Sequence, residues 1–194
     1  TYLWTKTGFP SNVYPNTATL TALDAGTYNV TITDNNGDTF TDSYVVTQPA
    51  AIIVNVTTTN VTCNGSGNGT STFAASGGTA PYTYIVDGVT QASNVVSNIG
   101  VGIHTYLVID SNGCTASGSF SITQPTAVTS SLAITDALCF GGSTGQLVVT
   151  AGGGTAPYTY SYDGAGYVSS NTKTGLLAGP HTVVVKDANN CLKS

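Results

Sequence analysis

Three residue types are missing from this 194-residue chain, which contains no Glu, no Arg and no Met. These residues, together with Lys and Leu, are the ones that commonly fill stable helices, whereas Thr, Val, Ile and Tyr suit a pleated strand. Thr supplies 34 residues and Tyr supplies 11. The composition therefore excludes a helix-rich domain and predicts an all-β protein.

Charge is also scarce, with four Lys against nine Asp and a net charge of -5 at pH 7. Nucleic acids and anionic membrane surfaces are bound through clustered cations. We therefore expect no nucleic-acid partner and no direct membrane insertion. The longest apolar run, residues 50–54, falls far short of the ~20 residues that a spanning helix needs. No signal peptide is visible, so we expect any export signal to lie on sequence outside this chain.

An internal repeat organises the sequence. The octapeptide Gly-Gly-Thr-Ala-Pro-Tyr-Thr-Tyr occurs at residues 77–84 and again at 153–160, an offset of 153 − 77 = 76. Cys63 and Cys139 share this offset, and so do the Thr-Gln-Pro triplets that end at Pro49 and Pro125. This offset divides the chain into three segments: the C-terminal half of a repeat at 1–49, a complete repeat at 50–125, and a repeat lacking its last strand at 126–194. We therefore expect the chain to be a fragment of a longer array of repeats.

The complete repeat shows the pattern of short strands. Ile52, Val54 and Val56 alternate with more polar neighbours, which is the period-two pattern of a strand with one buried face. Further strand-like segments follow, separated by Gly-rich or Asp-Gly turns. Six or seven strands in about 76 residues are typical of a small β-sandwich. Because Pro stiffens the short links between repeats, we expect a rod-like array.

A local motif indicates immunoglobulin-like sandwiches. Residues 24–28 read Asp-Ala-Gly-Thr-Tyr, the form of the tyrosine corner found in such domains. Alignment of the repeats places His104 and His181 in the position of Tyr28. We interpret both histidines as structural rather than as metal ligands, because they lie a full repeat apart and have no nearby acids at ligand spacing.

The four cysteines allow three disulfide connectivities, and the sequence alone does not choose among them. Pairing within repeats, Cys63 with Cys114 and Cys139 with Cys191, treats both copies alike and is the pairing we predict. The first segment has Asp38 where the second cysteine would stand (114 − 76 = 38). Disulfides would indicate an oxidising, extracytoplasmic environment. A zinc site is not expected, because the chain has no Cys-x-x-Cys.

The Asp-x-Asn segments are alternative metal candidates. Asp34, Asn36 and Asp38 could offer three oxygen ligands to calcium, but the Glu that completes a calcium loop is missing. Asp, Asn and Gly also favour tight turns, and we interpret these segments as turns. We predict no cofactor, with calcium left open. The Gly-rich run 63–69 lacks the features of a phosphate loop and is interpreted as a connection between strands.

No arrangement of residues predicts catalysis, because the chain lacks a Gly-x-Ser-x-Gly elbow and a pair of carboxylates placed for glycoside hydrolysis. Exposed aromatic side chains could bind sugars, with Trp4, Tyr14 and Tyr167 as candidates. The tyrosines of the repeated octapeptide are interpreted as packing residues; they are Tyr82, Tyr84, Tyr158 and Tyr160.

These motifs resemble the SprB repeat family of cell-surface proteins in Bacteroidota. That family has a Cys-x-Gly-x-x-x-Gly start, a Gly-Gly-Thr-x-Pro-Tyr-x-Tyr centre, and a Gly-x-Tyr-x-Val-x-Val-x-Asp-x-x-Gly-Cys end. Residues 63–69 and 139–145 match the start, and 77–84 and 153–160 match the centre. The end is matched from Gly26, Gly102 and Gly179, with His104 and His181 replacing Tyr, Asn190 replacing Gly, and Asp38 replacing Cys.

The resemblance implies a role that composition does not show. Proteins with these repeats are typically very large, are exported by the type IX system, and in gliding cells look like mobile surface adhesins. It thus implies a non-enzymatic stalk segment at the cell surface, outside the outer membrane. Expected partners are other repeats of the same chain, the motility or anchoring machinery, and an external surface or polysaccharide. Two alternatives are a carbohydrate-binding or spacer module of a secreted polysaccharide-active enzyme, and a static extracellular filament protein.

Overall fold

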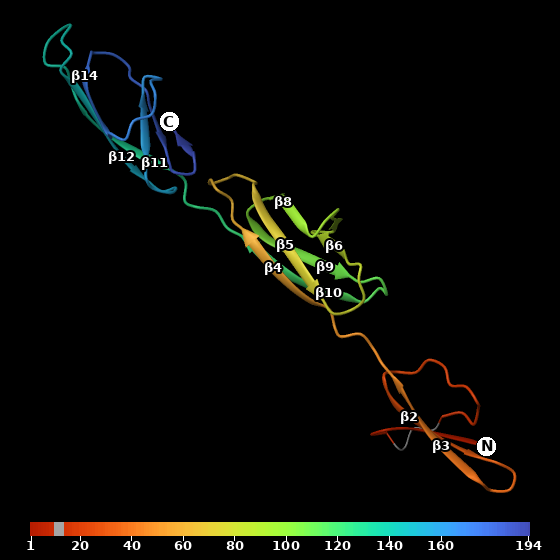
Figure 1. Ribbon diagram of the computed structural model, residues 1–194. Coiled ribbons are helices and arrows are strands. Elements are labelled where there is room, and N and C mark those ends of the chain that lie inside the picture. The colour runs from red at the N-terminus through yellow and green to blue at the C-terminus, as the bar shows by residue number, and fades with distance from the viewer. Residues whose placement is uncertain (10–13) are drawn as a thin grey trace. The chain divides into compact units, whose positions relative to one another are not determined.

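The computed structural model describes residues 1–9 and 14–194. Every regular element in these two ranges is a β-strand, and no helix occurs in them, which confirms the all-β prediction. The chain divides into two compact units, Thr1–Ala51 and Ile52–Ser194. Figure 1 labels many of their strands, and each unit is described by itself.

The first unit is built on one antiparallel sheet with the order β1-β2-β3. Tyr28 and Val30 of the central strand are buried, with 2% and 3% of their surface exposed. Residues two apart on a strand point to the same face, so these two side chains mark the covered face of the sheet. The strands are β1 (Tyr2–Lys6), β2 (Gly26–Thr33) and β3 (Thr39–Val46).

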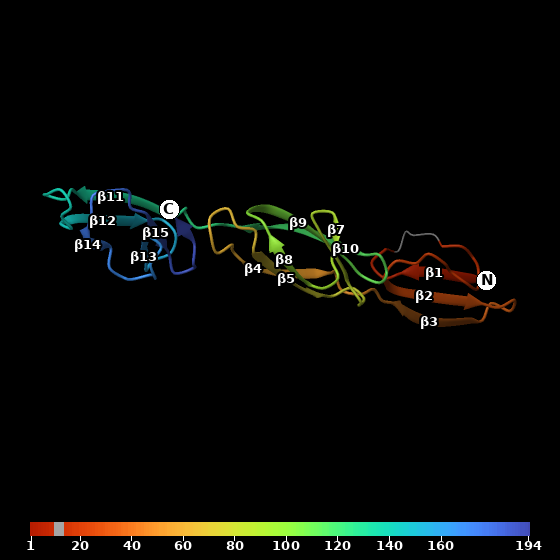
Figure 2. The ribbon, with the colours of Figure 1, turned by 90° about the horizontal axis from the view of Figure 1, so that it is seen from above.

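The first repeat of the second unit consists of two antiparallel sheets. One has the order β4-β5-β8 and the other the order β10-β9-β6-β7. Figure 2 shows β4 and β5 on one side of this repeat and β9 and β10 on the other. The strands are β4 (Ile53–Thr59), β5 (Gly69–Ser76), β6 (Thr83–Val86), β7 (Val89–Thr90), β8 (Val95–Ile99), β9 (Gly102–Ile109) and β10 (Thr115–Ile122).

A single hydrophobic core joins these two sheets into a β-sandwich. Phe73 of β5 is fully buried, and its ring centroid lies 5.4 Å from that of Tyr106 on β9 and 5.7 Å from that of Phe120 on β10. Burial of one such side chain contributes about 1.5–3 kcal/mol. The aromatic cluster is thus a main source of stability for this repeat.

The second repeat also has two antiparallel sheets and a core of its own, with the two-residue β16 in the position of β10. Its sheets have the orders β11-β12-β14 and β13-β15-β16. Val149 and Val185 are fully buried in this core, together with Leu147, Tyr160 and Tyr162. The strands are β11 (Thr129–Thr135), β12 (Gly145–Gly152), β13 (Thr159–Tyr162), β14 (Thr172–Leu176), β15 (Val183–Lys186) and β16 (Leu192–Lys193). Each core lies within one predicted repeat, while the predicted boundaries at 49/50 and 125/126 and the immunoglobulin-like strand order stay predictions.

The direction of the strands gives each repeat two distinct ends. The N–H of Val61, just after β4, donates to the carbonyl of Thr123, just after β10, so these two strands end on the same side. We call this side the distal end, because the chain leaves the repeat there. The turn at residues 110–114, before β10 begins, lies at the opposite, proximal end. Cys63 is therefore distal and Cys114 is proximal.

Candidate functional site

The predicted corner residue makes the same bond in all three segments. The hydroxyl of Tyr28 donates to the carbonyl of Asp24 at 2.9 Å. The Nε2 atoms of His104 and His181 lie 3.1 Å and 2.9 Å from the carbonyls of Gly100 and Leu177, again four residues earlier in the chain. This confirms that both histidines take the place of the tyrosine.

Each histidine also has an acidic partner that the sequence did not reveal. Nδ1 of His104 lies 2.7 Å from Asp87, and Nδ1 of His181 lies 2.8 Å from Asp163. Both aspartates stand at the first position of an Asp-Gly turn with positive φ, which brings them back toward the strand that carries the histidine. The hydrogen bond that the Asp87 carboxylate accepts from the His104 ring raises the pKa of His104, and the same bond lowers the pKa of Asp87.

The Asp-x-Asn segments form turns around a carboxylate. Oδ1 of Asp34 accepts hydrogen bonds from the backbone N–H groups of Asn36 and Asp38 at 2.8 Å and 2.9 Å. The three calcium candidates therefore lie together in one turn, where the Asp34 carboxylate already accepts hydrogen bonds from backbone N–H groups. Among the described residues, no group of three or more His, Cys, Asp or Glu side chains could hold a metal ion.

In the complete repeat, the equivalent aspartate also anchors the repeated octapeptide. Asp110 is buried, and its carboxylate accepts from the N–H groups of Thr79, Asn112 and Cys114 at 2.8–2.9 Å. Burial opposes the charged form, but these backbone donors outweigh it and hold the pKa of Asp110 below its ordinary value. A Cβ at Gly78, where φ is +57°, would come within 2.7 Å of this carboxylate, so the turn requires glycine.

The octapeptide tyrosines stabilise this turn and the core beneath it. The hydroxyls of Tyr82 and Tyr158 donate to the carbonyls of Gly77 and Gly153. Tyr84 packs against the first core and Tyr160 is buried in the second. The structure thus supports our interpretation of these tyrosines as packing residues.

The disulfide differs from the predicted pairing. Cys63 is bonded to Cys191, with their Cα atoms 5.6 Å apart, while Cys114 and Cys139 are free and exposed. The predicted bond within a repeat is wrong for a geometric reason. Cys63 and Cys114 lie at the two ends of β10, which has eight residues and is roughly 25 Å long. Cα atoms more than about 7 Å apart cannot be bridged.

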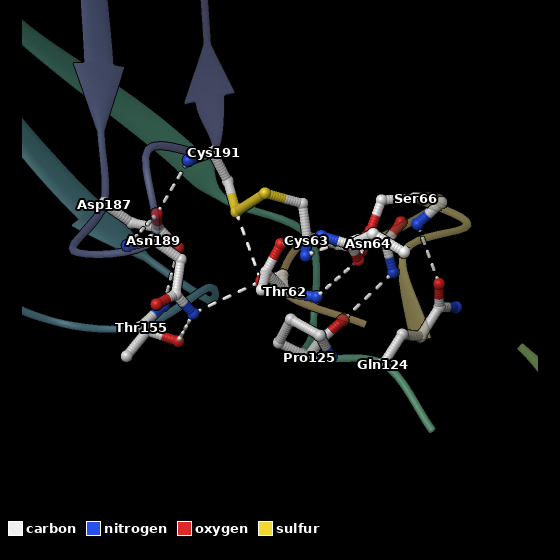
Figure 3. The surroundings of a disulfide bond; sticks show 12 residues. Thr62, Cys63, Asn64, Ser66, Gln124, Pro125, Thr155, Asp187, Asn189 and Cys191 are labelled. Carbon is white, nitrogen blue, oxygen red and sulfur yellow. Dashed lines mark hydrogen bonds between the residues drawn. A yellow bond between two sulfur atoms is a disulfide. The ribbon is translucent and has the colours of Figure 1, made fainter. Parts of the chain in front are cut away.

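The disulfide lies at the joint between the two repeats, which we define as residues 62–66, 124–126 and 187–191 (Figure 3). The side-chain amide of Asn189 donates to the carbonyl of Thr62 at 3.3 Å. A hollow of about 580 Å³, lined in part by residues 126–129 and 190–193, adjoins the bond. The disulfide thus adds a covalent link between the repeats to that of the backbone.

The Gln-Pro link is tied to the same joint. The side-chain oxygen of Gln124 accepts from the N–H of Gly65 at 2.8 Å, and the carbonyl of Pro125 accepts from the side chain of Asn64 at 3.1 Å (Figure 3). The carbonyl of Thr126 accepts from the N–H of Gly154 in the following repeat at 2.8 Å. The link is thus hydrogen-bonded to both repeats.

The candidate sugar-binding aromatics do not form one site. Trp4 and Tyr44, with Tyr2, line a hollow of about 260 Å³ on the first unit, and the indole N–H of Trp4 donates to the carbonyl of Thr17. Tyr14 packs edge-on against Tyr28 at 5.7 Å. Tyr167 of the second unit is partly exposed, with a Lys186 ammonium 4.0 Å from its ring centroid. Tyr44 was not among our candidates, because its partner in space comes from a distant strand.

Over residues 1–9 and 14–194, the structure contains no helix long and apolar enough to cross a membrane. A family model described as the SprB repeat matches residues 55–90 and 131–166. The two matches begin 131 − 55 = 76 residues apart, which is the offset of the internal repeat. A search of curated proteins found no match to the chain. The family match confirms the resemblance seen in the repeated motifs.

Proposed function

Because this chain contains two SprB repeats, we propose that it is a structural stalk segment of a large, repetitive cell-surface adhesin that serves surface attachment and gliding motility. SprB repeats are adhesin-type structural repeats rather than enzymatic domains. The observation that carries the proposal is the tandem family match, in register with a repeat of the three-dimensional fold.

The architecture of the second unit supports a mechanical role. Each repeat has its own closed core, and a disulfide and a hydrogen-bonded Gln-Pro link join the two repeats. In this proposal, stiff sandwiches in series transmit tension between a motility or anchoring machinery on the cell and a distal contact with a surface or polysaccharide. Export through the type IX system and a location outside the outer membrane belong to the same proposal.

Scarce charge supports the role of a spacer. Four Lys and nine Asp are spread over 194 residues, and Thr supplies 34 of them. Such a surface is hydrated by hydroxyl groups but attracts few charged partners over a distance. A stalk made of these repeats would hold its tip away from the cell without adhering along its length.

The proposal can be tested on living cells of the source bacterium. A fluorescent Fab raised against the intact chain is used to film cells on glass, with a Fab against an unrelated outer-membrane protein as the control. We expect labels that move along the cell surface, and weaker attachment when the Fab is bound. Labels that stay fixed indicate a static filament, and labels found mainly in the medium indicate a secreted spacer; either result refutes the motility role.

A second candidate, a carbohydrate-binding module, is favoured by one observation. Trp4, Tyr44 and Tyr2 line one hollow, and aromatic faces are suited to stacking on sugar rings. If this candidate is right, a glycan array will show saturable binding that Trp4→Ala abolishes. Tyr167→Ala, which changes an aromatic residue of the other unit, is the matched control and should leave the binding intact.

A further inference from the structure

Two cysteines of the second unit are free, and both occupy repeat positions that are bonded elsewhere in the same unit. Cys139 follows Cys63 by 76 residues, and Cys114 precedes Cys191 by 77. Cys63 and Cys191 form the disulfide, whereas Cys114 and Cys139 are exposed thiols. Cys139 is thus a distal cysteine like Cys63, and Cys114 is a proximal cysteine like Cys191, but both are free.

The ends of the repeats determine which cysteines can meet. The first cysteine of a repeat follows its first strand and lies at the distal end, while the second precedes the last strand and lies at the proximal end. In the observed bond, the distal cysteine of one repeat is joined to the proximal cysteine of the repeat that follows it. This is the arrangement that a head-to-tail array repeats at every joint.

The residues beside Cys139 are exposed as well. Leu138 and Phe140 flank it and are almost completely exposed, at 84% and 110% of their reference surface. They correspond to Thr62 and Asn64, which bond to the following repeat and to the Gln-Pro link at the existing joint. Ile134 of β11 and Leu177, which line a hollow of about 260 Å³ at this end, are also exposed. In the first repeat β10 contacts the equivalent strand β4, whereas here only β16 occupies the position of β10, so the shorter last strand leaves this end uncovered.

We propose that the loop Leu138-Cys139-Phe140 is half of a second joint, that its partner is another SprB repeat following in tandem, and that Cys139 forms a disulfide with the second cysteine of that repeat. The two thiols each lose one hydrogen as the S–S bond forms, and an external disulfide accepts the two electrons and two protons to give two thiols.

This inference goes beyond the proposed function and does not depend on it. A chain of repeats linked head to tail by disulfides could equally form a static filament or a spacer. If labelled cells showed no moving adhesin, the stalk proposal would fail while the pairing rule still stood. The pairing rule is tested by chemistry on the purified protein alone.

The test uses an extended chain in which residues 1–191 are followed by residues 115–194. This junction is in register, because Cys191 and Cys114 are equivalent, and it adds a complete last strand and one further repeat. Cys139→Ser is introduced in the added copy only, so that Cys63 and the original Cys139 are the only distal cysteines of the extended chain. The protein is oxidised with oxidised glutathione, alkylated, digested without reduction and mapped by mass spectrometry. Cleavage before aspartate places Cys63, Cys114 and Cys139 in separate peptides, which begin at Asp42, Asp110 and Asp136. The same cleavage separates the two Cys191 peptides, because different residues follow them.

We expect two bonds, Cys63 to the original Cys191, and the original Cys139 to the Cys191 of the added copy. Cys114 should remain alkylated. Cys139→Ser in the original copy should expose the thiol of the added Cys191, whereas Cys114→Ser, the matched control, should change neither bond. A bond between Cys139 and Cys191 of the same repeat, or free thiols at both expected partners, would overturn the proposal.

The unextended chain supplies a second arm that does not require the added repeat to fold. In the oxidised 194-residue protein, iodoacetamide should label Cys114 and Cys139, and the Cys63–Cys191 peptide pair should be recovered. Recovery of Cys63 with Cys114 and of Cys139 with Cys191 would refute the head-to-tail rule.

Discussion

Removal of the disulfide should destabilise the second unit and leave the first unchanged. The change is Cys63→Ser, which releases Cys191 from a bond that spans 128 residues of sequence. Cys139→Ser is the matched control, since Cys139 occupies the equivalent position one repeat later and is free.

The magnitude follows from the entropy of the unfolded chain. A bond that closes 128 residues restricts the unfolded state by about 5 kcal/mol on the chain-entropy model. The two repeats have separate cores, so one can unfold while the other stays folded, and the loop is then roughly half as long. Because the entropy varies with the logarithm of loop length, the value falls only to about 4 kcal/mol. We therefore expect a loss of about 4–5 kcal/mol in the free energy of unfolding.

The single Trp allows both units to be followed in one sample. Trp4 reports on the unit Thr1–Ala51, while far-ultraviolet circular dichroism reports on all strands. In guanidinium chloride, Cys63→Ser should move the dichroism transition to lower denaturant and leave the Trp4 transition in place. Reduction of the wild type should have the same effect. The reasoning is refuted if oxidised wild type and Cys63→Ser unfold at the same midpoint, or if Cys139→Ser destabilises as much.

Two further changes test the turns that hold the repeats together. Asp187→Ala leaves three backbone N–H donors without their buried acceptor, and should lower the free energy of unfolding of the second unit by about 3 kcal/mol, measured by thermal unfolding. Asp34→Ala changes the equivalent aspartate in an exposed turn, and should lower the free energy of unfolding by less than about 1 kcal/mol. The raised pKa of His104 predicts a dependence on pH: its bond to Asp87 stabilises fully below the unfolded histidine pKa of about 6.5, and this contribution is lost as pH rises through the folded value. Melting temperatures should thus fall as the pH rises from about 6.5 through the folded pKa of His104. The double change Asp87→Asn with Asp163→Asn should flatten the profile; an unchanged slope would contradict this origin.

Local sequence was sufficient for the features that depend on neighbours along the chain. Period-two alternation located β4, and alignment of the repeats placed His104 and His181 in the tyrosine position because that bond spans only four residues. Asp87 was missed as the partner of His104 because it lies 17 residues away, across a hairpin whose register the pattern did not specify.

The disulfide was predicted wrongly because we assumed that the two cysteines of one repeat bond to each other, whereas the observed bond joins cysteines of successive repeats. The order of strands contained the necessary signal: Cys63 follows the first strand and Cys114 precedes the last, and both strands run in the same direction through the sandwich. Two cysteines so placed lie at opposite ends. What sequence could not supply is that the facing ends of successive repeats come within bonding distance.

The bond between Cys63 and Cys191 also shortens the covalent path that carries tension through the chain. When the chain is pulled at its two termini, the covalent path passes from residue 63 through the two sulfur atoms to residue 191. This path bypasses 128 residues, which would extend to roughly 430 Å if the bond were broken. While the bond is intact, this length cannot be added to the stretched chain. Even if both sandwiches rupture, the molecule lengthens only through the residues outside the loop. The redox state of one pair of sulfur atoms thus sets how far this part of the chain can be extended.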